Sequence, residues 1–381
     1  MRRASEAEKA RLNDTFAALC AIPSPFGHEA GVAAHVTREL EWMGLAVEAD
    51  AKGNLLTRVR GRSDEHVLLC AHLDTVSVTG PIEPVLVDEG WENAHDAILG
   101  ADNKAAVAVF LELVRRAAVE GAPLGLELLL TVEEEDALAG AKAFDASTLR
   151  SRLGYVLDHA TPIGGVVVGS PTYYRIQAEF HGRAAHAGIR PEDGRSAVLA
   201  AAHALTAMPH GRIDEITTAN VGSITGGVGS TNVVPERCSV LAEARSLDPD
   251  RVETVVAQIV DALHDGAARG ECDVDIVTEK LFTGYRQKAG APAVAAAEAA
   301  LRACGYAPER IVTGGGSDAN ALELQGISCV NLANGTERNH EPTERVSVAA
   351  LEGMLDVALA LLDAAAALPE PEPTTAEHPT A

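Results

Sequence analysis

Short apolar runs alternate with helix-like segments through the first 170 residues of the chain and again after residue 283. Runs such as HVLLCA at 66–71 and LELLLTV at 126–132 are almost continuously apolar, which is typical of strands covered on both faces. A long helical segment at 103–120 separates these two runs. Apolar strands that alternate with helices form a mostly parallel sheet flanked by helices. The pattern therefore predicts an α/β fold.

The order of predicted elements changes between residues 171 and 282, where it becomes β-α-β-β-α-β. This order is typical of the ferredoxin-like unit, an antiparallel sheet under two helices. At 381 residues the chain also exceeds a typical single core. We therefore predict a discontinuous α/β domain at 1–170 and 283–367 with a smaller α+β domain inserted at 171–282. The Pro- and Glu-rich tail at 368–381 lacks an apolar face and is predicted to be disordered.

The chain carries 31 Lys and Arg against 55 Asp and Glu, a formal charge of −24. Nucleic acids and anionic membranes require a cationic face, so this balance argues against both as partners. The charged N-terminus lacks the apolar core of a signal peptide, and no apolar run reaches the roughly 20 residues that span a bilayer. The six cysteines lie far apart and are expected to be free thiols. These features predict a cytoplasmic protein.

Histidine and carboxylate side chains follow the predicted parallel strands, at the point where each strand ends. His72 and Asp74 follow one strand, Glu133–Glu135 follow the next, and Asp158 closes a third. Asp102 stands at the start of the long helix, where a carboxylate also suits the helix dipole. The ligand crevice of an open parallel sheet lies beyond the carboxyl ends of its strands. We therefore expect these side chains to converge in one cleft.

Several ionised carboxylates can share a cleft only if a cation neutralises them. Two divalent ions would balance Asp102, Glu135, Asp158 and a shared hydroxide, and neutral histidines would complete the shells. Such ligands suit Zn²⁺, although Co²⁺ and Mn²⁺ accept them too. Two ions about 3.5–4 Å apart acidify a water and hold the attacked carbonyl, while a further carboxylate carries the proton to the leaving amine. The residues therefore predict a two-metal hydrolase that cleaves an amide bond.

Seven motifs occur in one order along the chain: LCAHLDTV, ILGADNKAA, TVEEEDALAGAK, GYVLD, HGRAAHAGIRPEDGRSA, GGGSDAN and NGTERNHEPTE. Their combination resembles the dizinc exopeptidase family, which includes peptidase T, carboxypeptidase G and aminoacylase. The resemblance extends from about residue 10 to residue 365, and it is greatest to the tripeptidase or peptidase T-like branch. It implies a zinc exopeptidase-like α/β domain with an inserted lid and dimerisation domain.

The resemblance also implies which residues hold the metal ions. His72 and Asp158 would bind one ion, and Glu135 and His340 would bind the other. Asp102 would bridge the two ions. The peptide bond that follows Asp102 would be cis, although relatives often have Asp at the next position, where this chain has Asn.

Two further residues receive roles in catalysis from the resemblance. Asp74 would orient His72 through its second ring nitrogen, as outer carboxylates do for metal-binding histidines. Glu134 would be the general base. The run of three glutamates is ambiguous, but counting back from the following GAK places the base and the ligand at Glu134 and Glu135 and leaves Glu133 spare.

In the inserted domain, the resemblance places His186 near the carbonyl of the bond that is cleaved. Asn232 and Arg245 would grip the substrate, with Arg245 forking onto a carboxylate. In relatives this domain also mediates dimerisation, so we expect a homodimer in which His186 acts either within its own subunit or across to its neighbour.

Each motif alone also fits an ordinary structural role. A lone histidine is more often a polar surface residue than a ligand, the glutamate run could be a solvated helix start, and Asp102 could be a simple helix cap. A purely structural interpretation must, however, place five ligand-type residues by chance at strand ends in this order. Their joint occurrence therefore favours the metal site.

These features together predict a metallopeptidase that acts on short peptides, of the tripeptidase-type aminopeptidase kind. An N-acyl amino acid deacylase or a carboxypeptidase would use the same centre, because each also cleaves an amide. An aminopeptidase differs from these in needing an acidic partner for a free amine. A metal-containing binding protein without hydrolysis is the alternative from another class, although the base and all five ligands are present in this sequence.

Overall fold

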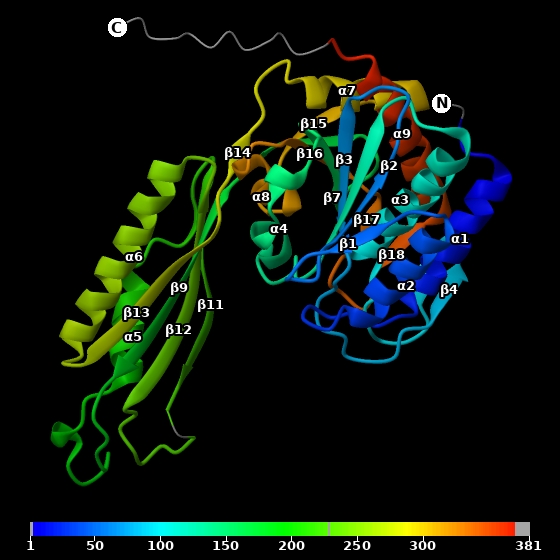
Figure 1. Cartoon of the computed structure of the whole chain (residues 1–381). Coiled ribbons are helices and arrows are strands. Elements are labelled where there is room, and N and C mark those ends of the chain that lie inside the picture. The colour runs from blue at the N-terminus through cyan, green and yellow to red at the C-terminus, as the bar shows by residue number, and fades with distance from the viewer. Residues whose placement is uncertain (1–2, 228, 370–381) are drawn as a thin grey trace, which may run out of the picture.

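The computed structural model describes residues 3–227 and 229–369, which form two bodies (Figure 1). The larger body is built on a nine-stranded sheet whose neighbouring strands are β1 (Val47–Ala49), β2 (Leu55–Val59), β6 (Gly125–Thr131), β3 (His66–His72), β7 (Leu153–His159), β16 (Ser328–Ala333), β8 (Gly165–Ser170) and β14 (Tyr285–Arg286), with β15 (Glu309–Val312) also paired to β8. Its central strands β6, β3, β7 and β16 run parallel, which confirms the predicted α/β fold.

Helices cover both faces of this sheet because its central strands are apolar on both sides. In β3, Leu69 and Ala71 belong to the apolar core on one face of the sheet, and Leu68 and Cys70 belong to the core on the opposite face. The helices on the first face are α1 (Glu6–Cys20), α2 (Ala30–Trp42), α3 (Ala101–Glu120), α7 (Pro292–Cys304) and α9 (Val348–Ala366). The second face carries α8 (Asp318–Leu324), near the short helices α4 (Ala139–Ala143) and η1 (Ala146–Thr148).

A small four-stranded sheet in the larger body was not predicted. Its strands, in spatial order, are β17 (Thr336–Glu337), β18 (Arg345–Ser347), β5 (Gly90–Asn93) and β4 (Pro84–Val87). Each has only two to four residues, so none is long enough to produce a recognisable alternation of apolar and polar side chains. The turn between β17 and β18 contains His340, so this sheet positions part of the candidate site.

The smaller body is a five-stranded antiparallel sheet under two helices. Its strands, in spatial order, are β10 (Gly211–Asp214), β11 (Thr217–Gly226), β12 (Arg237–Ser246), β9 (Thr172–His181) and β13 (Asp273–Phe282). Helices α5 (Ala197–Ala207) and α6 (Pro249–Arg269) bury one face of the sheet, and the short helix η2 (Pro191–Asp193) precedes α5. Figure 1 shows α6 on the side that points away from the larger body. The predicted ferredoxin-like order is present, with β10 as an additional short strand.

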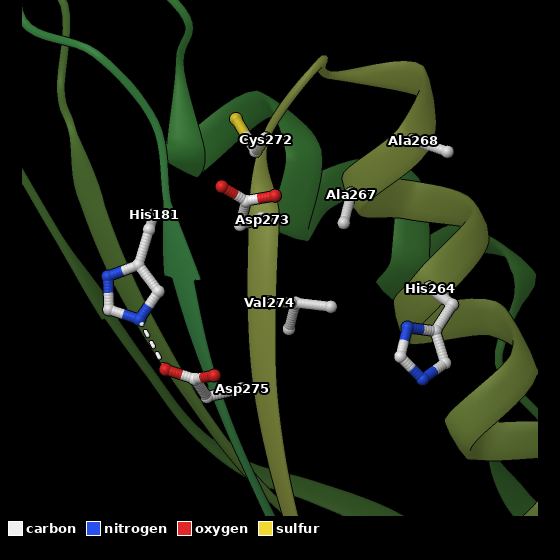
Figure 2. A pocket seen from close by; sticks show the side chains of 8 residues that line it. All are labelled: His181, His264, Ala267, Ala268, Cys272, Asp273, Val274 and Asp275. Carbon is white, nitrogen blue, oxygen red and sulfur yellow. Dashed lines mark hydrogen bonds and ion pairs between the residues drawn. The ribbon is translucent and has the colours of Figure 1, made fainter.

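A hollow of about 670 Å³ lies where the free edge of β13 meets the end of α6 (Figure 2). Its lining includes His264 of α6 and a pair in which His181 Nε2 lies 3.0 Å from Asp275 Oδ2. Figure 2 shows His181 and Asp275 on the opposite side of β13 from His264. None of the predicted site residues lines this hollow.

Other expectations concern the ends of the chain and its thiols. No helix within residues 3–227 and 229–369 is long and apolar enough to cross a membrane. All six cysteines are free thiols, as predicted. The predicted disordered tail at 368–381 lies outside the described residues, apart from Leu368 and Pro369.

Gly266 allows α5 and α6 to approach each other closely, which gives a test of the inserted body. A Cβ at this position would lie 2.6 Å from the backbone nitrogen of Ala204 and 2.7 Å from the carbonyl oxygen of Ala200. We expect Gly266→Ala to lower the free energy of unfolding by about 1–3 kcal/mol, because the two helices must separate. Urea unfolding followed by circular dichroism measures this change.

Gly31 in α2 provides the matched control. A Cβ there would lie 3.4 Å from its nearest neighbour, a side-chain atom of Ile22, so it fits with little rearrangement. Because alanine is the better helix former, Gly31→Ala should leave stability unchanged or raise it by up to about 1 kcal/mol. Equal unfolding midpoints for the two variants would contradict the close helix contact.

Candidate metal centre

The structure brings the five predicted metal ligands together at the carboxyl edge of the central sheet. His72 ends β3, Asp158 is the penultimate residue of β7, and Asp102 is the second residue of α3. Glu135 follows β6, and His340 lies in the turn between β17 and β18. The peptide bond after Asp102 is cis, as the family resemblance implied.

The ligand atoms form two groups that share Asp102. His72 Nε2 lies 3.3 Å from Asp102 Oδ1 and 3.6 Å from Asp158 Oδ1. His340 Nε2 lies 2.8 Å from Glu135 Oε1 and 3.4 Å from Asp102 Oδ2. Within each group the ligand atoms lie within 4.8 Å of one another. Asp102 therefore directs one carboxylate oxygen toward each histidine.

The donor atoms fit divalent metal ions. Each group offers one imidazole nitrogen and two carboxylates, a donor set that suits zinc and related ions. Asp102 Oδ1 is buried, and the ring nitrogen that lies 3.3 Å from it, His72 Nε2, is itself a candidate ligand atom, so both atoms can face the same ion. The His72 side chain is 2% exposed and that of His340 is 49% exposed. The centre is therefore enclosed at His72 and open to solvent at His340.

Burial opposes the ionisation of three acids of this centre, Glu134, Asp158 and Asp102. Burial raises the pKa of Glu134 well above its usual range, and the neighbouring Asp158 raises it further. Burial also raises the pKa of Asp158, with Asp102 adding to the effect. For Asp102, burial opposes ionisation, but hydrogen bonds with His340 and His72 outweigh it and lower the pKa. Such a cluster favours the binding of cations.

Neighbouring acids raise the pKa of both histidines. Hydrogen bonds with Asp102 and Glu135 raise the pKa of His340 to about 10. Burial acts to lower the pKa of His72, but hydrogen bonds with Asp102, Asp158 and other acids raise it well above its usual value. Protons and metal ions compete for the same ring nitrogens, and the acids that retain a proton there also attract a metal ion.

Asp74 contacts both the His72 ring and the loop that follows β6. His72 Nδ1 lies 3.0 Å from the Asp74 backbone oxygen and 3.5 Å from Asp74 Oδ1. The Asp74 carboxylate accepts the backbone N–H of Glu134 at 3.0 Å and that of Glu135 at 2.9 Å. The sequence pattern predicted only the contact with His72. Asp74 also fixes the segment that carries two acids of the site, and a side chain-to-backbone contact of this kind leaves no signal in sequence.

The structure separates the three consecutive glutamates. Glu133 has a left-handed backbone conformation, with φ of 51°. Its carboxylate forms an ion pair with Lys52, and its backbone N–H donates to Glu29 Oε1 at 3.1 Å. Glu134 and Glu135 instead lie in a ligand group with His72. Glu133 therefore points away from the centre while the next two glutamates point into it.

Three further side chains beside the centre were not assigned roles from sequence. Asn339 Nδ2 donates to Asp102 Oδ2 at 2.8 Å, and Glu344 accepts the backbone N–H of Asp102 at 3.0 Å. Asp318, the first residue of α8, follows the glycine-rich loop at 314–316, is buried, and accepts a hydrogen bond from the Thr131 hydroxyl. The NHEPTE and GGGSDAN motifs contain these residues, but the family resemblance gave a role to His340 alone among their side chains.

The structure does not bring His186 and Asn232 to the acids. They lie in the loops that join β9 to α5 and β11 to β12, where the Ala187 N–H donates to the Asn232 carbonyl oxygen at 2.9 Å. These loops are at the end of the inserted sheet that points away from the larger body (Figure 1). Since β9 has 10 residues, its two ends are about 30 Å apart.

Arg245 lies at the other end of the inserted sheet, next to the larger body. Its guanidinium is 4.0 Å from the ring centre of Tyr173 and forms two hydrogen bonds with Glu243. A third hydrogen bond, of 2.9 Å, reaches the carbonyl oxygen of Gly314 in the glycine-rich loop. Of the three residues predicted in the inserted domain, Arg245 is therefore the one that touches the larger body.

Comparison with known proteins agrees with this architecture. Residues 171–271 match the model of the peptidase dimerisation domain, and residues 54–161 match that of peptidase family M28. The chain is 35% identical over 368 residues to the uncharacterized protein YqjE of Bacillus subtilis, covering 93% of this chain and 98% of that protein.

Two solved structures are similar along nearly the whole chain. Aminopeptidase PepT from Bacillus cereus superimposes with a TM-score of 0.85 at 33% identity, covering 94% of this chain and 99% of that one. A tripeptidase from Staphylococcus aureus gives a TM-score of 0.89 at 31% identity, covering 94% and 98% of the two chains. Because each likeness covers 94% of this chain, it includes both bodies. The chain therefore belongs to the dizinc exopeptidase family of metallopeptidases.

Proposed function

We propose that the protein is a dizinc aminopeptidase of the tripeptidase type, acting on short peptides. The observation that carries this proposal is the sharing of Asp102 between a group with His72 and Asp158 and a group with Glu135 and His340. The two solved structures that resemble the chain over nearly their whole length are an aminopeptidase and a tripeptidase. Free thiols at all six cysteines fit a cytoplasmic enzyme.

The two ligand groups fit a pair of zinc ions, one held by His72 and Asp158 and one by Glu135 and His340, with Asp102 bridging them. Ions bound there would polarise the substrate carbonyl and lower the pKa of a water molecule. The residues of the chain supply the rest of the chemistry, because they orient the substrate and move the proton.

Glu134 is suited to carry that proton. It lies in a ligand group with His72 and Glu135, and its backbone is fixed by the Asp74 carboxylate. Burial raises its pKa well above the usual carboxyl value, which makes Glu134 a stronger base toward water. Glu134 would take a proton from water during attack on the carbonyl and pass it to the departing amine.

We assign the inserted domain, residues 171–282, to dimerisation and substrate binding. Residues 171–271 match the peptidase dimerisation domain, which supports a homodimer. His186 and Asn232 lie about 30 Å along the inserted sheet from its junction with the larger body, so they would act in the active site of the partner subunit. Arg245 lies beside the glycine-rich loop, where it would bind a substrate carboxylate in place of Glu243.

The general base can be tested with neighbouring glutamates. We expect Glu134→Gln to retain both metal ions but to lower kcat by about 10²–10⁴-fold, because the amide cannot shuttle a proton. Glu133→Gln is the matched control, since Glu133 pairs with Lys52 outside the ligand groups, and it should change kcat by less than about threefold. Full turnover by a metal-loaded Glu134→Gln protein would exclude Glu134 as the base.

The metal centre and the substrate class can be tested together. Protein stripped with a chelator should lose activity and regain it when about two zinc ions per chain are restored.

Free di- and tripeptides should be cleaved, and their N-acetylated forms should not, as measured by mass spectrometry. Equal cleavage of blocked peptides would favour the N-acyl amino acid deacylase or carboxypeptidase. Metal binding without any hydrolysis would favour a binding protein.

The role of His186 across subunits can be tested by complementation. His186→Ala and Glu134→Gln should each be nearly inactive alone. Refolding them together should restore about a quarter of wild-type activity, because half of the dimers are mixed and each mixed dimer has one complete site. If His186 serves its own subunit, the mixture will remain as inactive as its components.

A further inference from the structure

Two side chains without an assigned role hold the shared carboxylate of the metal centre. Asn339 Nδ2 donates to Asp102 Oδ2 at 2.8 Å. The Glu344 carboxylate accepts the backbone N–H of Gly100 at 2.7 Å and that of Asp102 at 3.0 Å. We propose that Asn339 and Glu344 are positioning residues that fix Asp102 between the two metal sites. The inference rests on the proposed dinuclear centre.

Glu344 fixes the backbone of Asp102. The first N–H groups of a helix have no partner within the helix, and Asp102 lies at the start of α3. Gly100, with φ of 77°, turns the chain there, and the backbone at Asp102 is not yet helical. Glu344 is 2% exposed, so it binds both N–H groups where water has little access. Burial raises the pKa of Glu344 to about 7, and in its ionised form the carboxylate also suits the positive end of α3.

Asn339 fixes the side chain of the same residue. Asn339 and His340 are consecutive, yet both approach Asp102 Oδ2, at 2.8 Å and 3.4 Å. In an extended chain, neighbouring side chains point to opposite sides. Arg338 and His340 have left-handed backbones, with φ of 56° and 68°, which turn the chain so that both side chains face one carboxylate. Non-glycine residues rarely adopt this conformation, and it recurs at functional sites.

Both contacts come from one short segment, residues 339–344, which also contains the ligand His340. This segment therefore supplies one metal ligand and sets the position of another that lies more than 230 residues away along the chain. Glu344 and Asn339 act on different parts of Asp102, its backbone and its carboxylate. Because outer partners of metal ligands typically change metal affinity by about 10–100-fold, the two contacts should be visible in metal binding.

The proposal is tested by zinc affinity, measured on full-length protein by competition with a chelator. Glu344→Gln keeps the shape of the side chain, but its amide can accept only one of the two N–H groups and meets the other with its own donor. We expect its zinc affinity to fall by about 10–100-fold. Asn339→Ala removes the contact with the carboxylate and should lower the affinity in the same direction. It keeps the proposal testable if Glu344→Gln does not fold.

Glu112 provides the matched control on the same helix. It is 2% exposed and forms ion pairs with Arg11 and Arg115, and it lies 10 residues along α3 from Asp102, or about 15 Å. Glu112→Gln should lower the thermal midpoint of the metal-free protein and leave zinc affinity within about threefold of wild type.

The outcomes separate positioning from general stability. Loss of zinc affinity in Glu344→Gln and Asn339→Ala, but not in Glu112→Gln, supports the proposal. Wild-type affinity in both site variants overturns it, and so does an equal loss in the Glu112→Gln control. If the wild-type chain binds fewer than two zinc ions, the proposed dinuclear centre fails, and that result is seen before any variant is measured.

Discussion

Carboxylates clustered at one edge of the central sheet repel one another, and much of the larger body serves to hold them in place. The parallel register pairs His72 with Thr131, so β3 and β6 end side by side, and the polar residues at their ends lie close together. Asp74 then fixes the loop that carries Glu134. Burial and neighbouring acids raise the pKa of Glu134 and Asp158. Because the fold holds these acids close together, their mutual repulsion favours the binding of cations at this edge of the sheet.

The fold was predictable from sequence where elements were long and apolar. The apolar run HVLLCA at 66–71 was expected to form a strand, and β3 spans His66–His72. The small sheet around β17 and β18 was not predicted, because strands of two or three residues are stabilised by neighbours distant in sequence and not by their own pattern. That sheet forms the turn that brings His340 to Asp102, so part of the site depends on structure that no local pattern indicates.

The residues of the candidate site also fall into two groups, those that could be identified from sequence and those that could not. Ligand-type side chains directly after apolar strands, such as His72 and Asp158, were identifiable because strand ends mark the cleft. Asn339 and Glu344 were not identifiable, because they act through contacts with a residue more than 230 positions earlier in the chain. Among the residues that the structure describes, Glu344 binds only backbone N–H groups, and because every residue except proline has one, the sequence gives no sign of these contacts. The residues that place the ligands are therefore harder to predict than the ligands themselves.

The two bodies meet close to the candidate metal centre. The chain crosses between them twice, and the Asn320 amide contacts both crossings, at the Thr283 carbonyl oxygen and the Ser170 hydroxyl. Asn320 belongs to α8, whose preceding glycine-rich loop accepts the hydrogen bond from Arg245. Two positions earlier in the chain, Asp318 binds Thr131 at the end of β6, beside the acids. One short helix thus contacts both the junction and the sheet edge that carries the candidate metal ligands, so the inserted domain is anchored beside the candidate site.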